Sequence, residues 1–345
     1  MKTRNTTRRL VLQSGSALAI SALLPRSLWA AAIAFEDIPR SDYVFATTCD
    51  DVAASHDLAG KTALITGCNS GLGYESMRTF VEHGAHVIGT ARTMEKAQKA
   101  CASVLGKDSK GKATPLVCEL TDMQSVVDCS NAVTELDVPI DILMCNAGVM
   151  ALPKLEQVDI DGVMLERQFV INHLGHYLLT RRVLPQVEAA SAPRVVWISS
   201  TGYTLAPKGG IQFDNLSGEV GYNGFKAYGQ TKLANILMSN EISRRYADEP
   251  LTSNAIHPGI VGTNLGRYIT GKPRDPNEPL RKGMKTPPEG AATQVYVAID
   301  KRLDGVSGYY FEDCNPVALK GDYAGDPELA AKLWDVSDEL VGSYL

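Results

Sequence analysis

Two residues with complementary chemistry, Tyr228 and Lys232, lie four positions apart in the segment Ala227–Lys232. Residues at positions i and i+4 share one face of a helix, so the ammonium group of Lys232 can approach the phenol of Tyr228. Because a nearby positive charge favours the phenolate, this spacing predicts that Lys232 lowers the pKa of Tyr228 from its usual value of about 10. Such a tyrosine can exchange a proton with the oxygen of a carbonyl or alcohol group.

A glycine-rich turn follows the first β-rich run, with Gly67, Gly71 and Gly73 in the pattern G-x-x-x-G-x-G. Glycine permits a sharp turn and a close approach of the backbone to a ligand, and the first amides of the next helix can face phosphates. The pattern departs from the G-x-G-x-x-G fingerprint because Ser76 stands at its last position. The turn predicts a dinucleotide site, with an ordinary strand-to-helix turn as the alternative. Together with the tyrosine and lysine, it predicts hydride transfer at a carbonyl carbon.

The elements that must position these residues appear as alternating β-rich runs and helix-period segments. The predicted strands are Thr62–Thr66, His86–Thr90, Thr114–Cys118, Ile140–Cys145, Arg194–Ser199, Thr252–His257 and Gly308–Phe311. The predicted helices include Leu72–Glu82, Met94–Val104, Ser125–Leu136, Val163–Glu188 and Gly229–Tyr246, and capping residues predict two more that begin after Thr286 and Asp326. The alternation predicts a single-domain α/β Rossmann fold, a doubly wound parallel sheet of about seven strands with helices on both faces. Ligands bind at the carboxyl ends of such strands.

The first 32 residues resemble a twin-arginine export signal, with Arg8 and Arg9 before an apolar stretch and small residues near Ala32. An uncleaved anchor is disfavoured, because the apolar stretch is shorter and more polar than the ~20 residues that a spanning helix needs. We therefore expect a periplasmic protein without stable membrane insertion, with a cytoplasmic one as the alternative. Residues 33–56 form an extension, and residues 57–345 form the domain.

The composition of the 345-residue chain, with 44% hydrophobic and 21% charged residues, is typical of a globular protein. Loss of residues 1–32 removes five basic side chains and no acidic one, so the net charge changes from −5 to −10. This acidity disfavours nucleic acid as a partner. The seven cysteines lack metal-binding spacing, so we expect no metal site and interpret them as small apolar residues.

Further motifs follow in a fixed order: Asn146-Ala147-Gly148 after the fourth strand, then Asn172, Ser199-Ser200, and His257-Pro258-Gly259 before Thr263. Together with the glycine turn and the Tyr228–Lys232 pair, this order resembles that of the short-chain dehydrogenases/reductases, above all their retinol dehydrogenase and WW-domain oxidoreductase branch. The resemblance extends from about Leu58 to Asp313. It implies an enzyme that acts on CH–OH groups with a nicotinamide dinucleotide.

The resemblance implies four catalytic residues. Tyr228 would be the general acid in reduction and the general base in oxidation, while Lys232 would also bind the nicotinamide ribose. Ser200 would hold the substrate oxygen, a choice over Ser199 that rests on the family pattern. Asn172 would fix the geometry of the site and a water that leads protons away from Lys232.

The resemblance also implies which residues contact the cofactor: Gly67, Asn69, Ser70, Gly71, Leu72, Gly73, Arg92, Glu119, Leu120, Asn146, Ala147, Gly148, Tyr228, Lys232, Pro258, Gly259 and Thr263. The second strand ends at Arg92, with no acid before Glu95. A carboxylate at this place binds the ribose hydroxyl of NAD, whereas an arginine accommodates a 2′-phosphate. We therefore predict NADP(H) rather than NAD(H), unless Arg92 is an ordinary surface residue. The family usually has aspartate where this chain has Glu119, so the role of Glu119 near the adenine is open.

A second pair with the same spacing, Tyr222 and Lys226, is rejected because Gly221 and Gly224 disfavour a helix there. Three histidines near the motifs lack an aspartate partner and are interpreted as packing or capping residues: His173, His176 and His257.

Residues 264–285 form a long loop with proline, glycine, apolar and basic residues, which is typical of a lid over a substrate. This mixture of apolar and basic residues predicts a small alcohol or carbonyl substrate that is amphipathic or lipophilic. The alternative is a solvated surface loop without a substrate role. Two other functions stay open: a light-dependent protochlorophyllide reductase-like enzyme, and a catalytically silent nucleotide-binding protein. The predicted helices Val163–Glu188 and Gly229–Tyr246 correspond to those through which relatives pair, so we expect a homo-oligomer.

Overall fold

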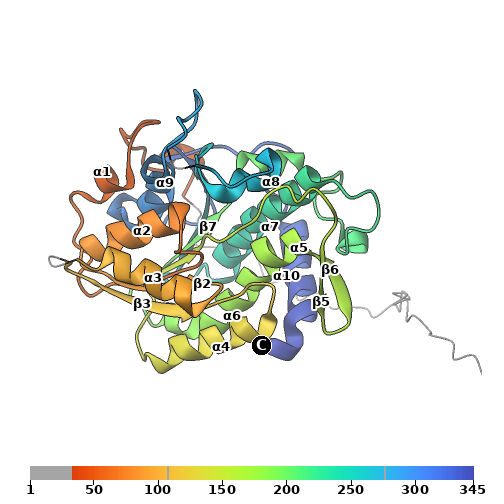
Figure 1. The fold of residues 1–345 in the computed structure, drawn as a ribbon, viewed down its shortest axis with the longest axis horizontal. Coiled ribbons are helices and arrows are strands. Elements are labelled where there is room, and N and C mark those ends of the chain that lie inside the picture. Colours follow the sequence, from red (N-terminus) through yellow and green to blue (C-terminus); the bar gives the residue numbers. More distant parts are fainter. Residues whose placement is uncertain (1–32, 107–108, 276) are drawn as a thin grey trace, which may run out of the picture.

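A computed structural model of the chain describes residues 33–106, 109–275 and 277–345 (Figure 1). The predicted export signal lies outside these residues. The strands are β1 (Thr62–Ile65), β2 (His86–Ala91), β3 (Lys112–Val117), β4 (Ile142–Cys145), β5 (Gln157–Ile160), β6 (Val163–Glu166), β7 (Arg194–Ile198), β8 (Thr252–His257), β9 (Tyr310–Glu312) and β10 (Asn315–Pro316). The α-helices are α1 (Cys49–Ala53), α2 (Gly71–Glu82), α3 (Met94–Val104), α4 (Met123–Glu135), α5 (Arg167–Phe169), α6 (Gly175–Glu188), α7 (Gly224–Arg245), α8 (Arg267–Thr270), α9 (Pro287–Ile299) and α10 (Pro327–Val341).

The main sheet has eight strands in the order β10-β9-β8-β7-β4-β1-β2-β3. All neighbouring pairs are parallel except β9 and β10, which are antiparallel. The strand order reverses beside β1, because β2 and β3 lie on one side of it and β4 on the other. A crevice for a ligand forms at such a switch point, outside the carboxyl ends of the strands. The predicted doubly wound fold is confirmed.

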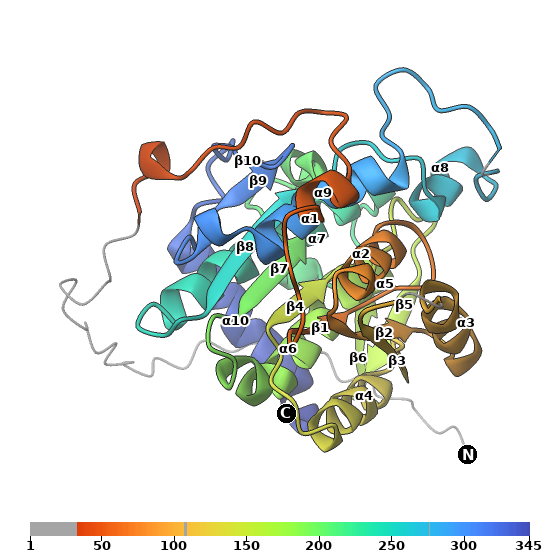
Figure 2. The same cartoon turned by 90° about the vertical axis from the view of Figure 1, so that its left-hand side faces the viewer.

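Helices cover both faces of this sheet, because successive strand residues point to opposite sides. Leu64 of β1 packs into a core formed with α4, α6, α7 and α10, whereas its neighbours Ala63 and Ile65 pack with α1, α2, α3 and α9 (Figure 2). All seven cysteines are buried free thiols, as expected for small apolar residues. The two cores hold the strand ends in place, and the site is built at those ends.

The capping signals at two late helices are confirmed. Thr286 forms a capping box with Glu289 at the start of α9, and Asp326 accepts hydrogen bonds from the amides of Glu328 and Leu329 at the start of α10. These caps satisfy amides that have no partner inside the helix.

The predicted helix Val163–Glu188 is wrong at its beginning. Val163–Glu166 is β6, which pairs antiparallel with β5 through a turn at Asp161 and Gly162, both with positive φ. An Asp-Gly pair between two β-rich runs is a strong hairpin signal, and the helical period that follows it obscured this signal. Helical structure starts at Arg167 and continues through a π-helical turn into α6.

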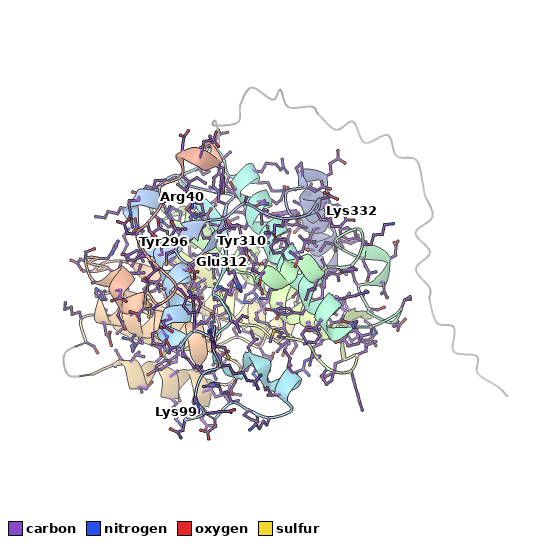
Figure 3. The ribbon with its side chains drawn as sticks, turned by 90° about the horizontal axis from the view of Figure 1, so that it is seen from above. Arg40, Lys99, Tyr296, Tyr310, Glu312 and Lys332 are labelled. Carbon is purple, nitrogen blue, oxygen red and sulfur yellow. The ribbon has the colours of Figure 1, made fainter. Side chains whose placement is uncertain are left out.

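The N-terminal extension, residues 33–56, packs along α9 and the β9–β10 edge (Figure 2). The ring of Tyr43 lies edge-on to Tyr296 of α9, which Figure 3 labels, with 5.9 Å between the ring centroids. Ser41 bonds to the turn between β9 and β10. The extension is therefore an integral layer of the fold, although its sequence had no readable role.

The outer faces of α6 and α7 are covered by α10 within the same chain. Trp334 of α10 lies edge-on to Tyr177 of α6, with 5.2 Å between the ring centroids, and the guanidinium of Arg245 of α7 lies 4.4 Å from the Trp334 ring centroid.

In the described part of the chain, none of the helices has both the length and the apolarity to cross a membrane.

Candidate active site

The two residues from which the chemistry was predicted lie together on α7. Asn223 caps this helix by accepting hydrogen bonds from the amides of Phe225 and Lys226, so the helix is already formed at Tyr228. The Nζ atom of Lys232 lies 5.5 Å from the centroid of the Tyr228 ring, and both side chains are buried. The predicted i and i+4 proximity is confirmed.

The prediction that Lys232 lowers the pKa of Tyr228 is wrong for the chain as the structure has it. Burial raises the pKa of Tyr228 to about 12, and a hydrogen bond with Ser200 acts in the opposite direction. Burial lowers the pKa of the Lys232 amine to about 8. The Lys232 Nζ donates to the carbonyl oxygen of Ile198 at 2.8 Å, so the ammonium is held by the backbone and lies over the tyrosine ring.

Ser199 and Ser200 have different partners, which separates two residues that the sequence could not. The hydroxyl of Ser199 is buried and donates to the carbonyl of Lys232 at 2.7 Å, so it anchors β7 to α7. The hydroxyl of Ser200 accepts a hydrogen bond from the amide of Gly202 at 3.0 Å, and it lowers the pKa of Tyr228 against the effect of burial. A Cβ at Gly202 would lie 3.1 Å from the Tyr228 ring and 3.3 Å from the Ser200 Oγ. Ser200 is therefore the serine beside the phenol.

Asn172 lies in the π-helical turn Val170–Leu174, a kind of irregularity that is frequent at functional sites. Its amide oxygen accepts from the amide of Val149 at 2.8 Å, and its Nδ2 donates to the carbonyl of Val149 and the hydroxyl of Thr231, both at 2.9 Å. A Cβ at Gly148 would lie 3.2 Å from the Asn172 Oδ1 and 3.8 Å from the Lys232 Nζ. Asn172 thus ties the end of β4 to α7 beside the buried amine.

The glycine turn leads from β1 into α2. Gly67 and Gly71 have φ angles of 73° and 61°, which other residues rarely adopt. A Cβ at Gly73 would lie 2.5 Å from the Asn146 Nδ2 and 2.6 Å from the Gly67 carbonyl oxygen, so only glycine fits there. Ser70, Asn69 and Leu72 complete the turn, and the Ser70 side chain makes no capping bond among the described atoms. The first amides of α2 can therefore face an anion.

Asn146, Ala147 and Thr66 connect the glycine turn to the end of β4. The Thr66 hydroxyl accepts hydrogen bonds from the amides of Asn146 and Ala147 at 2.9 and 3.0 Å, while Asn146 Nδ2 donates to the Thr66 carbonyl at 2.8 Å. The same hydroxyl lies 2.8 Å from the Nε2 of His176. Sequence reasoning gave no role to Thr66, although a polar residue at the end of an apolar strand was a signal for one.

The segment after β8 reaches the glycine turn from the other side. Pro258 and Gly259 leave the strand, and Gly259 has a φ of 89°. The hydroxyl of Thr263 accepts from the amide of Leu265, and its methyl group would lie 3.3 Å from a Cβ at Gly71. The structure thus brings Thr263 to the cradle formed by the turn.

The three residues predicted around the adenine, Arg92, Glu119 and Leu120, differ in their exposure to solvent. Arg92 follows the last residue of β2 and is exposed. The Glu119 carboxylate accepts from the amide and the hydroxyl of Thr121, so it is already engaged locally. The side chain of Leu120 is buried against Gly175. Only the backbone of Leu120 can therefore contact a cofactor.

The histidines beside the site have structural partners. Burial lowers the pKa of both His173 and His176 to about 3 and that of His257 to about 4, so they are neutral near pH 7. The Nε2 of His173 bonds with the Ser337 hydroxyl, and the Nδ1 of His176 with the Asn172 carbonyl. For His173 and His176 these contacts agree with the interpretation of the histidines as packing or capping residues.

Tyr222 and Lys226, the second pair with this spacing, do not lie on one helix, because only Lys226 belongs to α7. Tyr222 precedes the cap of α7, and its hydroxyl donates to the Leu152 carbonyl at 3.1 Å. The reason for rejecting it was partly wrong, because Gly224 opens the helix and the helix begins five residues before the predicted Gly229. Gly224 is required there, since a Cβ would lie 2.4 Å from the Leu152 carbonyl oxygen.

The fold and this site define a class: a doubly wound α/β protein with a glycine-rich cradle, a half-buried serine, and a buried tyrosine and lysine. The family model described as short chain dehydrogenase matches residues 61–273. The chain belongs to the short-chain dehydrogenase family, whose members are oxidoreductases that act on CH–OH groups.

Three curated relatives agree with the branch predicted from the motifs. Short-chain dehydrogenase TIC 32 B, chloroplastic, of Brassica napus is 39% identical over 88% of this chain and 96% of its own length. Retinol dehydrogenase 14 of Homo sapiens is 36% identical over 95% of this chain and 98% of its own length. The WW domain-containing oxidoreductase of Homo sapiens is 35% identical over 89% of this chain and 74% of its own length.

Proposed function

We propose that the chain is an NADP(H)-dependent oxidoreductase that interconverts an alcohol and a carbonyl compound. The observation that carries the proposal is the convergence of Ser200, Tyr228 and Lys232, with the Lys232 Nζ near Gly148 and the neighbouring Ala147 packed against Gly67 of the cradle. Ser200 follows β7, whereas Tyr228 and Lys232 lie on α7, so the fold brings groups from two separate segments together.

The cradle fits a dinucleotide. Gly67 and Gly73 let the turn pack tightly against Asn146 and Ala147, and the first amides of α2 together with Thr263 lie at the same turn. Bound there, a nicotinamide dinucleotide supplies or accepts the hydride. Arg92 at the end of β2 would bind the 2′-phosphate of NADP(H), since a guanidinium suits a phosphate.

The side chains of the site would handle the proton. In the reducing direction Tyr228 donates its phenolic proton to the substrate oxygen, and Ser200 donates a hydrogen bond to the same oxygen. The raised pKa of Tyr228 keeps the phenol protonated near neutral pH, which suits proton donation. Lys232, whose pKa burial lowers to about 8, is largely charged at pH 7, and its Nζ lies over the Tyr228 ring.

The first experiment is purification of the mature protein from its native compartment, with identification of the nucleotide that stays bound. A panel of carbonyl compounds of rising lipophilicity is then reduced with NADPH and with NADH. We expect NADPH in the protein and a lower KM for NADPH. A clear preference for NADH would refute the assignment of Arg92.

We propose a small amphipathic or lipophilic substrate that contacts the loop of residues 264–285. Support comes from the position of the loop, which starts next to Thr263 and includes α8. The similarity to a protein named retinol dehydrogenase is in line with a lipophilic alcohol. Equal kcat/KM along a series of chain lengths would argue for a solvated loop without a substrate role.

Two other functions predict different results in the same experiments. A protochlorophyllide reductase-like enzyme would carry a pigment that absorbs red light. A catalytically silent protein would bind NADPH tightly and reduce none of the carbonyl compounds. The complete set of Ser200, Tyr228, Lys232 and Asn172 supports catalysis.

We also propose export to the periplasm and a homo-oligomer. Both proposals rest on the sequence. For the oligomer, the structure adds that α10 covers the faces of α6 and α7 through which we expected the chains to pair. An oligomer would therefore use other surfaces or displace α10. N-terminal sequencing of the mature protein tests the first proposal, and light scattering after size-exclusion chromatography tests the second.

A further inference from the structure

Lys285, at the end of the loop after β8, is a lysine whose charge is buried. Its side chain is 1% exposed, its Nζ donates to the Asp313 carboxylate, and the ring of Phe45 lies 5.0 Å from the Nζ. The Asp313 side chain is 38% exposed. Burying an ammonium is costly, and a partner at a fixed place is needed to offset the loss of hydration. An apolar side chain would have filled this place at lower cost.

The backbone of Lys285 holds the segment that leaves β8. Lys285 donates to the Ile260 carbonyl at 2.8 Å and accepts from the Gly262 amide at 3.0 Å, which closes a parallel bridge with Val261. A Cβ at Gly259 would lie 2.9 Å from the Lys285 Cδ, so this segment runs directly over the lysine stem. The same segment ends at Thr263, beside the cradle.

The partner carboxylate lies in a strained turn that the N-terminal extension holds. Asp313 and Cys314 both have positive φ angles, 47° and 57°, and such conformations persist only where the surroundings fix them. Ser41 of the extension donates its hydroxyl to the Cys314 carbonyl at 2.8 Å and its amide to the Asn315 Oδ1 at 3.0 Å. The extension therefore fixes the place of the Asp313 carboxylate.

We propose that Lys285 and Asp313 are positioning residues, which couple the N-terminal extension through the β9–β10 turn to the segment 258–263 beside the cofactor cradle. The expected effect on cofactor binding rests on the proposed function. The coupling between the extension and segment 258–263 does not. A charged pair suits this task because it stabilises one relative placement of two loops, whereas apolar contacts tolerate sliding.

Hydrogen exchange in the full mature chain, followed by mass spectrometry, measures the coupling without any turnover. Lys285→Met keeps an unbranched stem and removes the charge, and we expect the Gly262 and Lys285-position amides to exchange at least ~10-fold faster. Lys282→Met alters an exposed lysine of the same loop and is the matched control, expected to leave these amides unchanged. Unchanged exchange in Lys285→Met would overturn the proposal.

Two further variants test the two ends of the coupling. Asp313→Asn leaves a buried ammonium without its carboxylate, whereas Lys285→Met leaves a carboxylate that water can reach, so Asp313→Asn should accelerate exchange more. Ser41→Ala, in the extension, should accelerate exchange at the same amides. If Ser41→Ala alters only its own surroundings, the link to the extension is refuted.

Kinetics separate positioning from general structural damage. Loosening of segment 258–263 lowers the population able to bind the cofactor, so KM for NADPH should rise ~3-fold or more in Lys285→Met. Saturating cofactor restores the ordered segment, and kcat should then stay within about twofold of the parent value. If kcat falls by the same factor by which KM rises, the positioning role would be overturned. If the parent protein turns over no substrate, the proposed function fails, while the exchange data still decide the coupling.

Discussion

Replacement of Tyr228 by phenylalanine removes one oxygen atom from the site and leaves the ring in place. The ring keeps its contact with Lys232 at 5.5 Å from its centroid, and Gly202 leaves room for it on the other side. The structural loss is the polar contact of the hydroxyl with Ser200, and a single such contact corresponds to at most about 1.5 kcal/mol of folding free energy. The variant should therefore fold and retain the cofactor cradle.

The catalytic loss should be much larger than the structural one. Without the phenol the site lacks its proposed proton donor, and we expect kcat to fall by at least ~10², as is usual for a missing acid–base group. This corresponds to about 2.7 kcal/mol in the activation barrier. The assay is carbonyl reduction followed by the loss of NADPH absorbance, with the NADPH Kd measured separately by fluorescence and expected to change less than about twofold.

Tyr222→Phe is the matched control, because it also removes one tyrosine hydroxyl with a hydrogen bond, here to the Leu152 carbonyl, from the region where α7 begins. We expect its kcat to stay close to that of the parent protein. Full kcat in Tyr228→Phe, or an equal loss in Tyr222→Phe, would refute the assignment of the general acid.

Three further outcomes follow from the geometry. Arg92→Ala should raise the KM for NADPH about tenfold and leave that for NADH unchanged, as expected when one exposed charge-assisted contact to phosphate is lost; equal changes for both would contradict the 2′-phosphate assignment. Gly73→Ala should abolish nucleotide binding in a fluorescence titration, because its Cβ would lie 2.6 Å from a backbone oxygen, whereas Gly266→Ala meets no atom within 4 Å and should bind normally. The free energy of unfolding should fall as the pH drops from 6.5 towards 3, because burial lowers the pKa of His173 and His176 to about 3 and only the unfolded chain takes up protons in that window. Above pH 6.5 both states are neutral at these residues, and urea unfolding at a series of pH values should show a shallower decline in His173→Gln.

Local signals in the sequence determined much of this protein. The alternation of strands and helices predicted the doubly wound sheet, and the glycine turn predicted the cradle, because both depend on backbone conformation and hydrophobic period over a few residues. The spacing of Tyr228 and Lys232 predicted their proximity, since it follows from helix geometry alone. The capping box at Thr286 is equally local and was found for the same reason.

Only the tertiary structure decided the properties that depend on burial and on distant partners. The pKa of Tyr228 is raised because the surrounding elements exclude water, an effect that no spacing in the sequence contains. Ser199 and Ser200 differ only in what the fold places beside each hydroxyl. The Lys285–Asp313 pair joins residues 28 positions apart. The turn that holds Asp313 is bonded to an extension more than two hundred residues earlier in the chain. Such long-range contacts exist only after the chain has packed, so they could not be predicted from local patterns.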